Sequence, residues 1–111
     1  MSSRKILIID DDHGVTDTFS RMLRLEGYEV QTASDPEAGL RECARSRPDA
    51  IIVDLRMPLI DGLGFLRLLR EREEHKTTPV AIVTGDYFLE DAEGSEVRSL
   101  GAQVLFSART R

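Results

Sequence analysis

The 111-residue sequence predicts an α/β fold in which five parallel strands alternate with helices in a doubly wound sheet. Two observations lead to this prediction. Short apolar runs, the first of them Lys5–Ile9, alternate with longer segments whose apolar residues recur at helical spacing. The connections between segments are short, which favours right-handed crossovers and helices on both faces of the sheet. We expect one domain over residues 1–111, without a linker or an internal repeat.

The first half of the chain gives two strands and two helices after the opening residues. The first strand is followed by a helix over residues 15–25, which Gly27 ends. Residues 28–33 form a weaker and more polar strand, which we place nearer the edge of the sheet. Ser34 or Asp35 would cap the second helix, with Pro36 in its first turn, and Arg47-Pro48 stops it.

The second half continues the alternation. A third strand covers residues 50–55, and the following helix, residues 62–72, turns four apolar residues inward: Leu63, Phe65, Leu66 and Leu69. Residues 79–84 contain the fourth strand. Residues 88–100 form a fourth helix that Gly94 and Ser95 weaken, and the fifth strand is residues 103–107.

Bulk properties exclude several classes of function. The net charge of −5 argues against direct nucleic-acid binding, and no apolar run approaches the length of a membrane span, so the cytoplasm is the expected compartment. The single cysteine, Cys43, is expected to be a buried apolar residue. His13 is expected on the surface at a helix start, and His75 in a solvated loop over residues 73–76.

Acidic and polar residues follow three of the predicted strands. Asp10 and Asp11 come after the first strand, Asp54 closes the third and Thr84 closes the fourth. Ligands in doubly wound sheets bind beyond the carboxyl ends of the strands, where strand order reverses. If the first and third strands are neighbours, three carboxylates meet in one pocket, which repels itself unless a cation fills it.

These residues and the turns beside them resemble the receiver domains of two-component response regulators, the CheY-like family. The similarity covers residues 4 to about 108 and rests on these motifs: Asp10-Asp11, Asp54 with Met57-Pro58 and Asp61-Gly62, Thr84-Gly85, and Gly101-Ala102. The resemblance implies a flavodoxin-like sheet with the strand order 2-1-3-4-5.

The resemblance also implies a function. Asp54 would accept a phosphoryl group from a phosphohistidine on a sensor histidine kinase or a phosphotransfer protein, as a signalling domain without conventional turnover of a substrate. Mg²⁺ would be held by Asp11, Asp54 and the backbone carbonyl of Arg56, and by Asp10 directly or through water. Thr84 would hydrogen-bond a phosphoryl oxygen and move with it.

The sequence departs from the family pattern near its end. Ala108 stands where the family carries a lysine, and Arg109 could replace that lysine only if the backbone shifts. Leu105 stands where an aromatic switch residue is usual. The alternative function is therefore a phosphorylation-independent pseudo-receiver that serves as an interaction module. An enzyme on a flavodoxin-like or phosphatase-like sheet has little support, because there is no Gly-rich phosphate loop and Arg56 stands where a second acid would be needed.

Receiver domains usually continue into a fifth helix after the fifth strand, whereas this sequence stops at Arg111, soon after that strand. We expect part of one sheet face, and the flank of the first helix that bears Phe19 and Met22, to be left open. A homodimer through this face is the leading expectation, and a chain cut from a longer regulator or hybrid kinase is the competing one.

Overall fold

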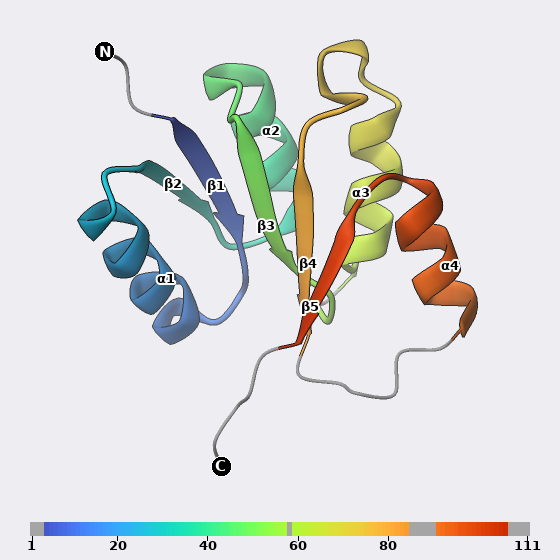
Figure 1. Cartoon of the computed structure of the whole chain (residues 1–111), viewed down its shortest axis with the longest axis horizontal. Coiled ribbons are helices and arrows are strands. Elements are labelled where there is room, and N and C mark those ends of the chain that lie inside the picture. Colours follow the sequence, from blue (N-terminus) through green and yellow to red (C-terminus); the bar gives the residue numbers. More distant parts are fainter. Residues whose placement is uncertain (1–3, 58, 85–90, 107–111) are drawn as a thin grey trace.

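A parallel five-stranded sheet in the order β2-β1-β3-β4-β5 forms the centre of the molecule (Figure 1). The computed structural model describes residues 4–57, 59–84 and 91–106. The strands are β1 (Lys5–Ile9), β2 (Glu29–Ala33), β3 (Ala50–Asp54), β4 (Val80–Thr84) and β5 (Gln103–Phe106). This confirms the predicted doubly wound, flavodoxin-like sheet, and β2 lies at its edge as expected.

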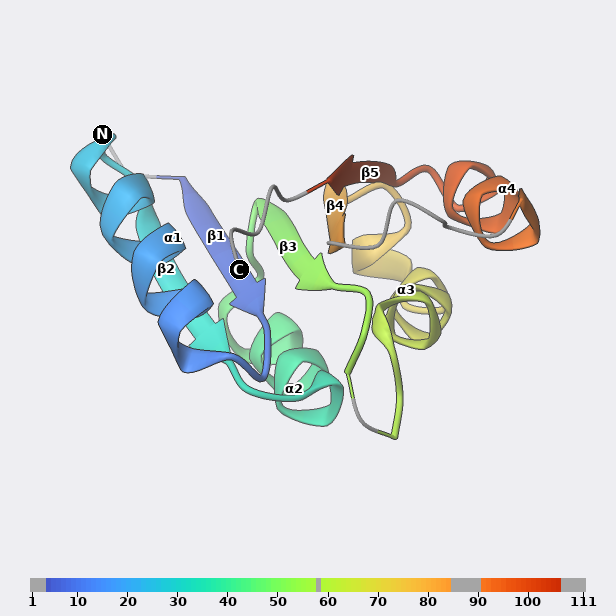
Figure 2. The same ribbon diagram turned by 90° about the horizontal axis from the view of Figure 1, so that it is seen from below.

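Four α-helices and one 3₁₀ helix flank the sheet within the described residues. They are α1 (His13–Leu25), α2 (Pro36–Ser46), α3 (Gly62–Arg70), η1 (Glu73–His75) and α4 (Asp91–Ser99). Figure 2 shows α2 and α3 side by side below the sheet, with α4 beyond α3 at the β5 edge. None of these helices is long and apolar enough to cross a membrane.

Helix boundaries differ from the prediction by one turn or less. α1 begins at His13 rather than at residue 15, because the Asp12 carboxylate accepts hydrogen bonds from the amides of Gly14 and Val15 and so caps the helix. α3 ends at Arg70, two residues earlier than expected. The expected helix start at residue 88 and strand end at residue 107 lie outside the described residues.

Gly94 does not interrupt the fourth helix, contrary to the expectation that it weakens this segment. α4 runs continuously from Asp91 to Ser99, and Gly94 lies within it. Val97 is fully buried in the main core, so tertiary packing holds a helix whose intrinsic propensity is low.

The main core fills the face of the sheet that α2, α3 and α4 cover. Alternate strand residues point into it, and all four inward residues predicted for α3 are buried there. Gly39 of α2 lets the helix approach the sheet closely, since a Cβ at this position would lie 2.5 Å from Cδ1 of Ile9.

The opposite face has a thinner cover. Its core consists of Ile6, Ile8 and Val30, with Phe19 and Leu23 of α1 packed against them. The only buried residues of α1 are Thr16 and Ser20, while Met22 is 56% exposed. Within the described residues α1 is the only helix on this face. Of the flank that was expected to be open, Met22 is exposed, whereas Phe19 packs against the core.

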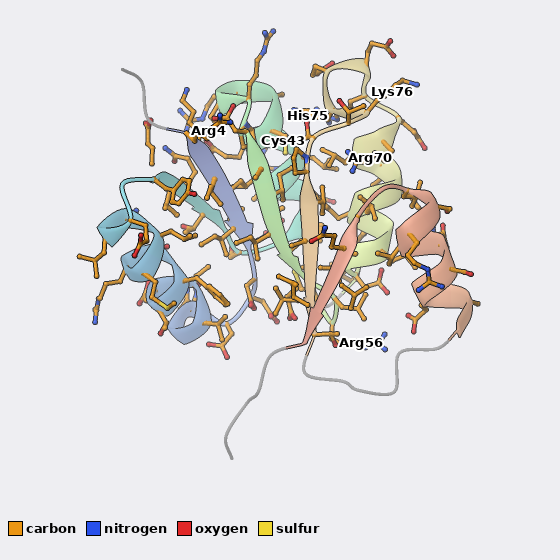
Figure 3. All side chains as sticks on the ribbon, viewed as in Figure 1. Arg4, Cys43, Arg56, Arg70, His75 and Lys76 are labelled. Atoms are coloured by element: carbon orange, nitrogen blue, oxygen red, sulfur yellow. The ribbon has the colours of Figure 1, made fainter. Side chains whose placement is uncertain are left out.

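His75 is buried, and its prediction as part of a solvated loop is wrong. The ring is 2% exposed and lies at the end of η1 (Figure 3). Its Nδ1 is 2.8 Å from Oγ1 of Thr78, and its Nε2 is 3.3 Å from the carbonyl oxygen of Cys43 in the last turn of α2. His75 thus joins two elements 32 positions apart in the sequence.

Candidate functional site: an acidic pocket at the ends of β1 and β3

Asp10 and Asp54 are placed by neighbouring central strands. Ile9 of β1 pairs with Val53 of β3, so the residues that follow them, Asp10 and Asp54, lie side by side. The amide of Asp10 donates to the carbonyl of Ala33 in β2, which fixes the backbone beyond the end of β1. Both side chains are nearly enclosed, with exposures of 4% for Asp10 and 7% for Asp54. The two carboxylates therefore lie at the carboxyl end of the sheet, where strand pairing and a backbone hydrogen bond fix the chain.

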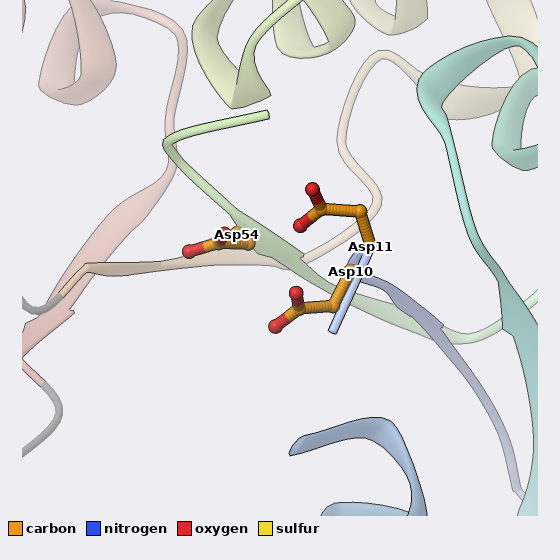
Figure 4. A group of neighbouring side chains, drawn as sticks. All are labelled: Asp10, Asp11 and Asp54. Carbon is orange, nitrogen blue, oxygen red and sulfur yellow. The ribbon is translucent and has the colours of Figure 1, made fainter. Parts of the chain in front are cut away.

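Asp11 adds a third carboxylate to the pair. Each of the three residues offers a carboxylate oxygen, and these oxygens all lie within 4.8 Å of one another. Figure 4 shows the three side chains extending in the same general direction from the ends of their strands. Asp11 is exposed, whereas Asp10 and Asp54 are buried, so the pocket opens to solvent on the Asp11 side. Like charges this close disfavour one another, and a bound cation offsets that repulsion.

The donor set fits Mg²⁺. Magnesium binds oxygen ligands at about 2.0–2.1 Å in an octahedron, so two of its ligand atoms are at most about 4.2 Å apart. Three carboxylate oxygens within 4.8 Å of one another need only small side-chain rotations to meet that geometry. Carboxylates are also the ligand type that this ion prefers over nitrogen or sulfur. Among the described residues, this is the only cluster of acidic, histidine or cysteine side chains with such spacing.

The loop after Asp54 is packed tightly against the strand by Gly62. The amide of Gly62 donates to the carbonyl of Leu55, and a Cβ at Gly62 would lie 2.6 Å from the carbonyl oxygen of Asp54. Asp61 caps α3 by accepting from the amide of Gly64. The Asp61-Gly62 pair in the sequence therefore has a physical role: it starts α3 directly against the backbone of Asp54.

Thr84 lies at the same end of the sheet, on the strand next to β3. Asp54 pairs with Val83 of β4, and Thr84 is one residue further along. Its side chain is fully buried. The structure thus brings Thr84 to the same end of the sheet as the acidic cluster, as the sequence predicted. Of the residues at which the sequence departs from the family, Leu105 lies in β5 and is 48% exposed, whereas Ala108 and Arg109 lie outside the described residues.

Arg56 forms a contact that the sequence did not indicate. Its guanidinium reaches Glu93 of α4 with two hydrogen bonds, Nη1 to Oε2 at 3.2 Å and Nη2 to Oε1 at 3.4 Å. A second pair follows one turn later, where Nη2 of Arg67 in α3 is 2.6 Å from Oε1 of Glu96. That hydrogen bond lowers the pKa of Glu96 and raises the pKa of Arg67. The sequence does not indicate this pair, because Glu93 is 37 residues away from Arg56.

A family model for the response regulator receiver domain matches residues 6–105. Among curated proteins, the transcriptional regulatory protein PrrA of Mycobacterium leprae is 37% identical over 91 residues, which is 82% of this chain and 38% of PrrA. Response regulator MprA of the same organism is 39% identical over 80 residues, 72% of this chain and 34% of MprA. The chain thus spans little more than a third of the length of these relatives.

Solved structures agree with the sequence comparisons. The chemotaxis protein CheY4 of Vibrio cholerae superposes with a TM-score of 0.88 at 29% identity, covering 98% of this chain and 90% of CheY4. A response regulator receiver domain protein from Clostridium thermocellum gives a TM-score of 0.84 at 31% identity, covering 96% of this chain and 84% of that protein. The acidic pocket, the strand order and these matches lead to one conclusion: the chain belongs to the response regulator receiver domain family.

Proposed function

We propose that this receiver domain takes a phosphoryl group onto Asp54 from a phosphohistidine. The observation that supports the proposal is the cluster of Asp10, Asp11 and Asp54, with carboxylate oxygens within 4.8 Å of one another at the carboxyl end of the sheet. Membership in the family implies a histidine kinase or a phosphotransfer protein as the partner. Receiver domains are signalling modules rather than enzymes that turn over a small substrate, and we propose the same for this chain.

In the proposed reaction, one carboxylate oxygen of Asp54 attacks the phosphorus atom in line with the phosphorus–nitrogen bond of the donor. That bond breaks, its electron pair stays on the imidazole nitrogen, and the nitrogen takes up a proton. The product on this chain is an acyl phosphate. Asp54 is 7% exposed, so the donor can reach it from solvent while most water is excluded from around its carboxylate.

The surrounding residues would neutralise and orient the incoming group. Asp10, Asp11, Asp54 and the backbone carbonyl of Arg56 would hold Mg²⁺, which supplies positive charge where the phosphoryl oxygens gather. The hydroxyl of Thr84 would donate a hydrogen bond to one phosphoryl oxygen. Gly62 keeps the backbone of Asp54 in place, because α3 starts directly against it.

A titration tests this proposal and separates it from a phosphorylation-independent module. Mg²⁺ and then beryllofluoride, which mimics the acyl phosphate, are added while backbone amide shifts are followed by NMR. We expect Mg²⁺ to shift the amides next to Asp10, Asp11 and Asp54. Beryllofluoride should then shift residues around Asp54 and Thr84 and spread to β5. Metal binding without any response to beryllofluoride would favour the interaction module instead.

We also propose that a second copy of the chain covers the open face beside α1. Ile6, Ala50, Ile52 and Ala81 line a shallow hollow on this face, and Leu105 of β5, 48% exposed, points the same way. An isologous contact would bury these apolar residues on both copies. Sedimentation at micromolar concentration should show a dimer that Leu105→Glu weakens. A monomer for the unchanged chain would contradict this proposal and leave the phosphoacceptor proposal untouched.

A further inference from the structure

Arg56 connects the loop of the acidic pocket to α4. It lies two residues after Asp54, and both terminal nitrogens of its guanidinium bond the carboxylate of Glu93, at 3.2 and 3.4 Å. The side chains are 48% and 21% exposed. Figure 3 shows Arg56 at the carboxyl end of the sheet, below the end of β4 and β5. The pair therefore joins the proposed phosphorylation site to the first turns of a peripheral helix.

Phosphorylation would change the charge that Arg56 faces. Replacing the single charge of Asp54 with an acyl phosphate adds about one negative charge to a pocket that already holds Asp10 and Asp11. Two residues span at most about 7 Å of extended chain, so the phosphoryl group falls within the range of a rotating arginine side chain. No lysine follows β5 at position 108, where the sequence has alanine. Arg56 is thus a cation placed to compensate the new charge.

Glu93 and a phosphoryl group on Asp54 would bind Arg56 with unequal strength. The ion pair between Arg56 and Glu93 is partly exposed. Its two hydrogen bonds, at 3.2 and 3.4 Å, are longer than those of a strong charge-assisted pair. A phosphoryl group offers more negative charge and three strong acceptor oxygens, and the planar guanidinium matches it with two parallel hydrogen bonds. Phosphorylation therefore favours transfer of the side chain from Glu93 to the phosphoryl group.

We propose that Arg56 exchanges Glu93 for the phosphoryl group on Asp54, and that this exchange releases the first turns of α4. The inference rests on the proposed function, because it needs the phosphoryl group on Asp54. The later part of α4 stays attached through the pair of Arg67 with Glu96 and the burial of Val97. The signal is then a local opening at the start of α4, where the carboxylate of Glu93 is no longer bonded to Arg56.

Beryllofluoride affinity in the presence of Mg²⁺ tests the exchange with three variants. Arg56→Gln should bind beryllofluoride about tenfold more weakly, because a charged bidentate contact is lost. Glu93→Gln should bind it a few-fold more tightly, because the competing partner of Arg56 is gone. Arg67→Gln removes the same charge from the other ion pair of α4 and should leave the affinity unchanged. If the ion pair had only a structural role, the two substitutions would change the beryllofluoride affinity in the same direction, whereas the exchange predicts changes of opposite sign.

Hydrogen exchange of α4 gives the second readout. In the unchanged protein, beryllofluoride should speed exchange of the amides that bond to carbonyls in the first turn of α4, and Glu93→Gln should show that faster exchange already without it. Arg56→Lys should recover part of the affinity, since lysine keeps the charge but not the paired hydrogen bonds.

The outcomes separate this inference from the proposed function. If the unchanged protein binds beryllofluoride and Arg56→Gln binds it equally well, the exchange is overturned and the phosphoacceptor role stands. If beryllofluoride protects α4 from exchange instead of opening it, the release of α4 is overturned. If the unchanged protein does not bind beryllofluoride at all, both proposals fall.

Discussion

The acidic pocket and the outer edge of the molecule, formed by α4 and the turn after it, are held in place by different interactions. At the pocket, strand pairing and backbone hydrogen bonds fix Asp10 and Asp54, and Gly62 packs α3 against the same backbone. At the outer edge, arginine side chains reach across to α4 and to the turn after it. Backbone pairing resists movement, whereas exposed ion pairs exchange partners easily. The acidic pocket is therefore expected to be rigid, whereas the side-chain contacts of α4 can rearrange.

Arg70 provides the largest expected effect at the outer edge. Its guanidinium donates to three backbone carbonyls, those of Leu100, His75 and Thr78, at 2.7 to 2.8 Å. Arg70→Ala leaves these acceptors without their charged donor and should lower the free energy of unfolding by about 3 kcal/mol. Urea unfolding measures the loss.

Arg67→Ala is the matched control, since it removes an arginine from the same helix. Arg67 is 54% exposed, and its guanidinium bonds the side chain of Glu96 rather than backbone carbonyls. Its removal should change the unfolding free energy by no more than the scatter of the measurement. Equal losses for both arginines would mean that the outer edge does not depend on the backbone contacts of Arg70.

Cys43, in the main core, makes the stability of the folded protein depend on pH in the alkaline range. Burial raises the pKa of its thiol from 9.0 to about 11. Below pH 9 the folded and unfolded chains both keep the proton. Between pH 9 and about 11 the unfolded chain loses the proton and the folded one keeps it, so folding is progressively disfavoured, by about 2 to 3 kcal/mol in full.

The Cys43 prediction is checked by unfolding at several pH values from 7 to 11, beside Cys43→Ala. The variant should be less stable at neutral pH, because it leaves a cavity, but its stability should fall less steeply above pH 9. Parallel curves for the two proteins would show that the thiol does not titrate in this range on unfolding.

Gly62 tests the rigidity of the pocket itself. Gly62→Ala brings a Cβ within 2.6 Å of the carbonyl oxygen of Asp54, a backbone atom that cannot move without shifting β3. We expect a loss of about 2 kcal/mol in stability and weaker Mg²⁺ binding. Gly64→Ala is the control in the same turn, because its Cβ would meet side-chain atoms rather than backbone: Cγ2 of Ile60 at 2.8 Å, which a rotation of that side chain can move, and Oδ1 of Asp61 at 3.5 Å. If Gly62→Ala binds Mg²⁺ normally, the pocket tolerates more movement than this account allows.

The smallest expected effect comes from adding the lysine that the sequence lacks. If Arg56 supplies the compensating charge, Ala108→Lys should tighten beryllofluoride binding only slightly in the unchanged protein. In the Arg56→Gln background the same substitution should restore most of the lost affinity, about tenfold. Equal gains in both backgrounds would show that the two cations act independently.

The fold could be predicted from the sequence because its signals are local. An apolar run such as Lys5–Ile9 specifies a buried strand, and the polar residues that follow it must lie at the carboxyl end of the sheet. The gathering of Asp10, Asp11 and Asp54 follows from that rule once strand order is known. The recognition of the family came from the spacing of these same residues, and the comparisons confirm it.

The parts that the sequence did not reveal depend on distant partners. His75 lies among charged residues and looks solvated, but it is buried because a carbonyl of Cys43 and the hydroxyl of Thr78 satisfy its ring nitrogens. The same holds for the side chain of Arg56, whose partner Glu93 is on another element. Gly94 shows the converse, since packing of α4 against the core outweighs its poor helix propensity.

Direct phosphorylation tests the central claim. The chain is incubated with Mg²⁺ and acetyl phosphate, a small acyl phosphate donor, and intact mass is measured beside Asp54→Asn and Asp61→Asn. Asp61→Asn is the matched control, because asparagine still caps α3 while one nearby carboxylate is lost. We predict that the unchanged chain and Asp61→Asn each gain one phosphoryl group that a chelator of Mg²⁺ prevents, and that Asp54→Asn gains none. Equal phosphorylation of Asp54→Asn, or none in the unchanged chain, would contradict the account.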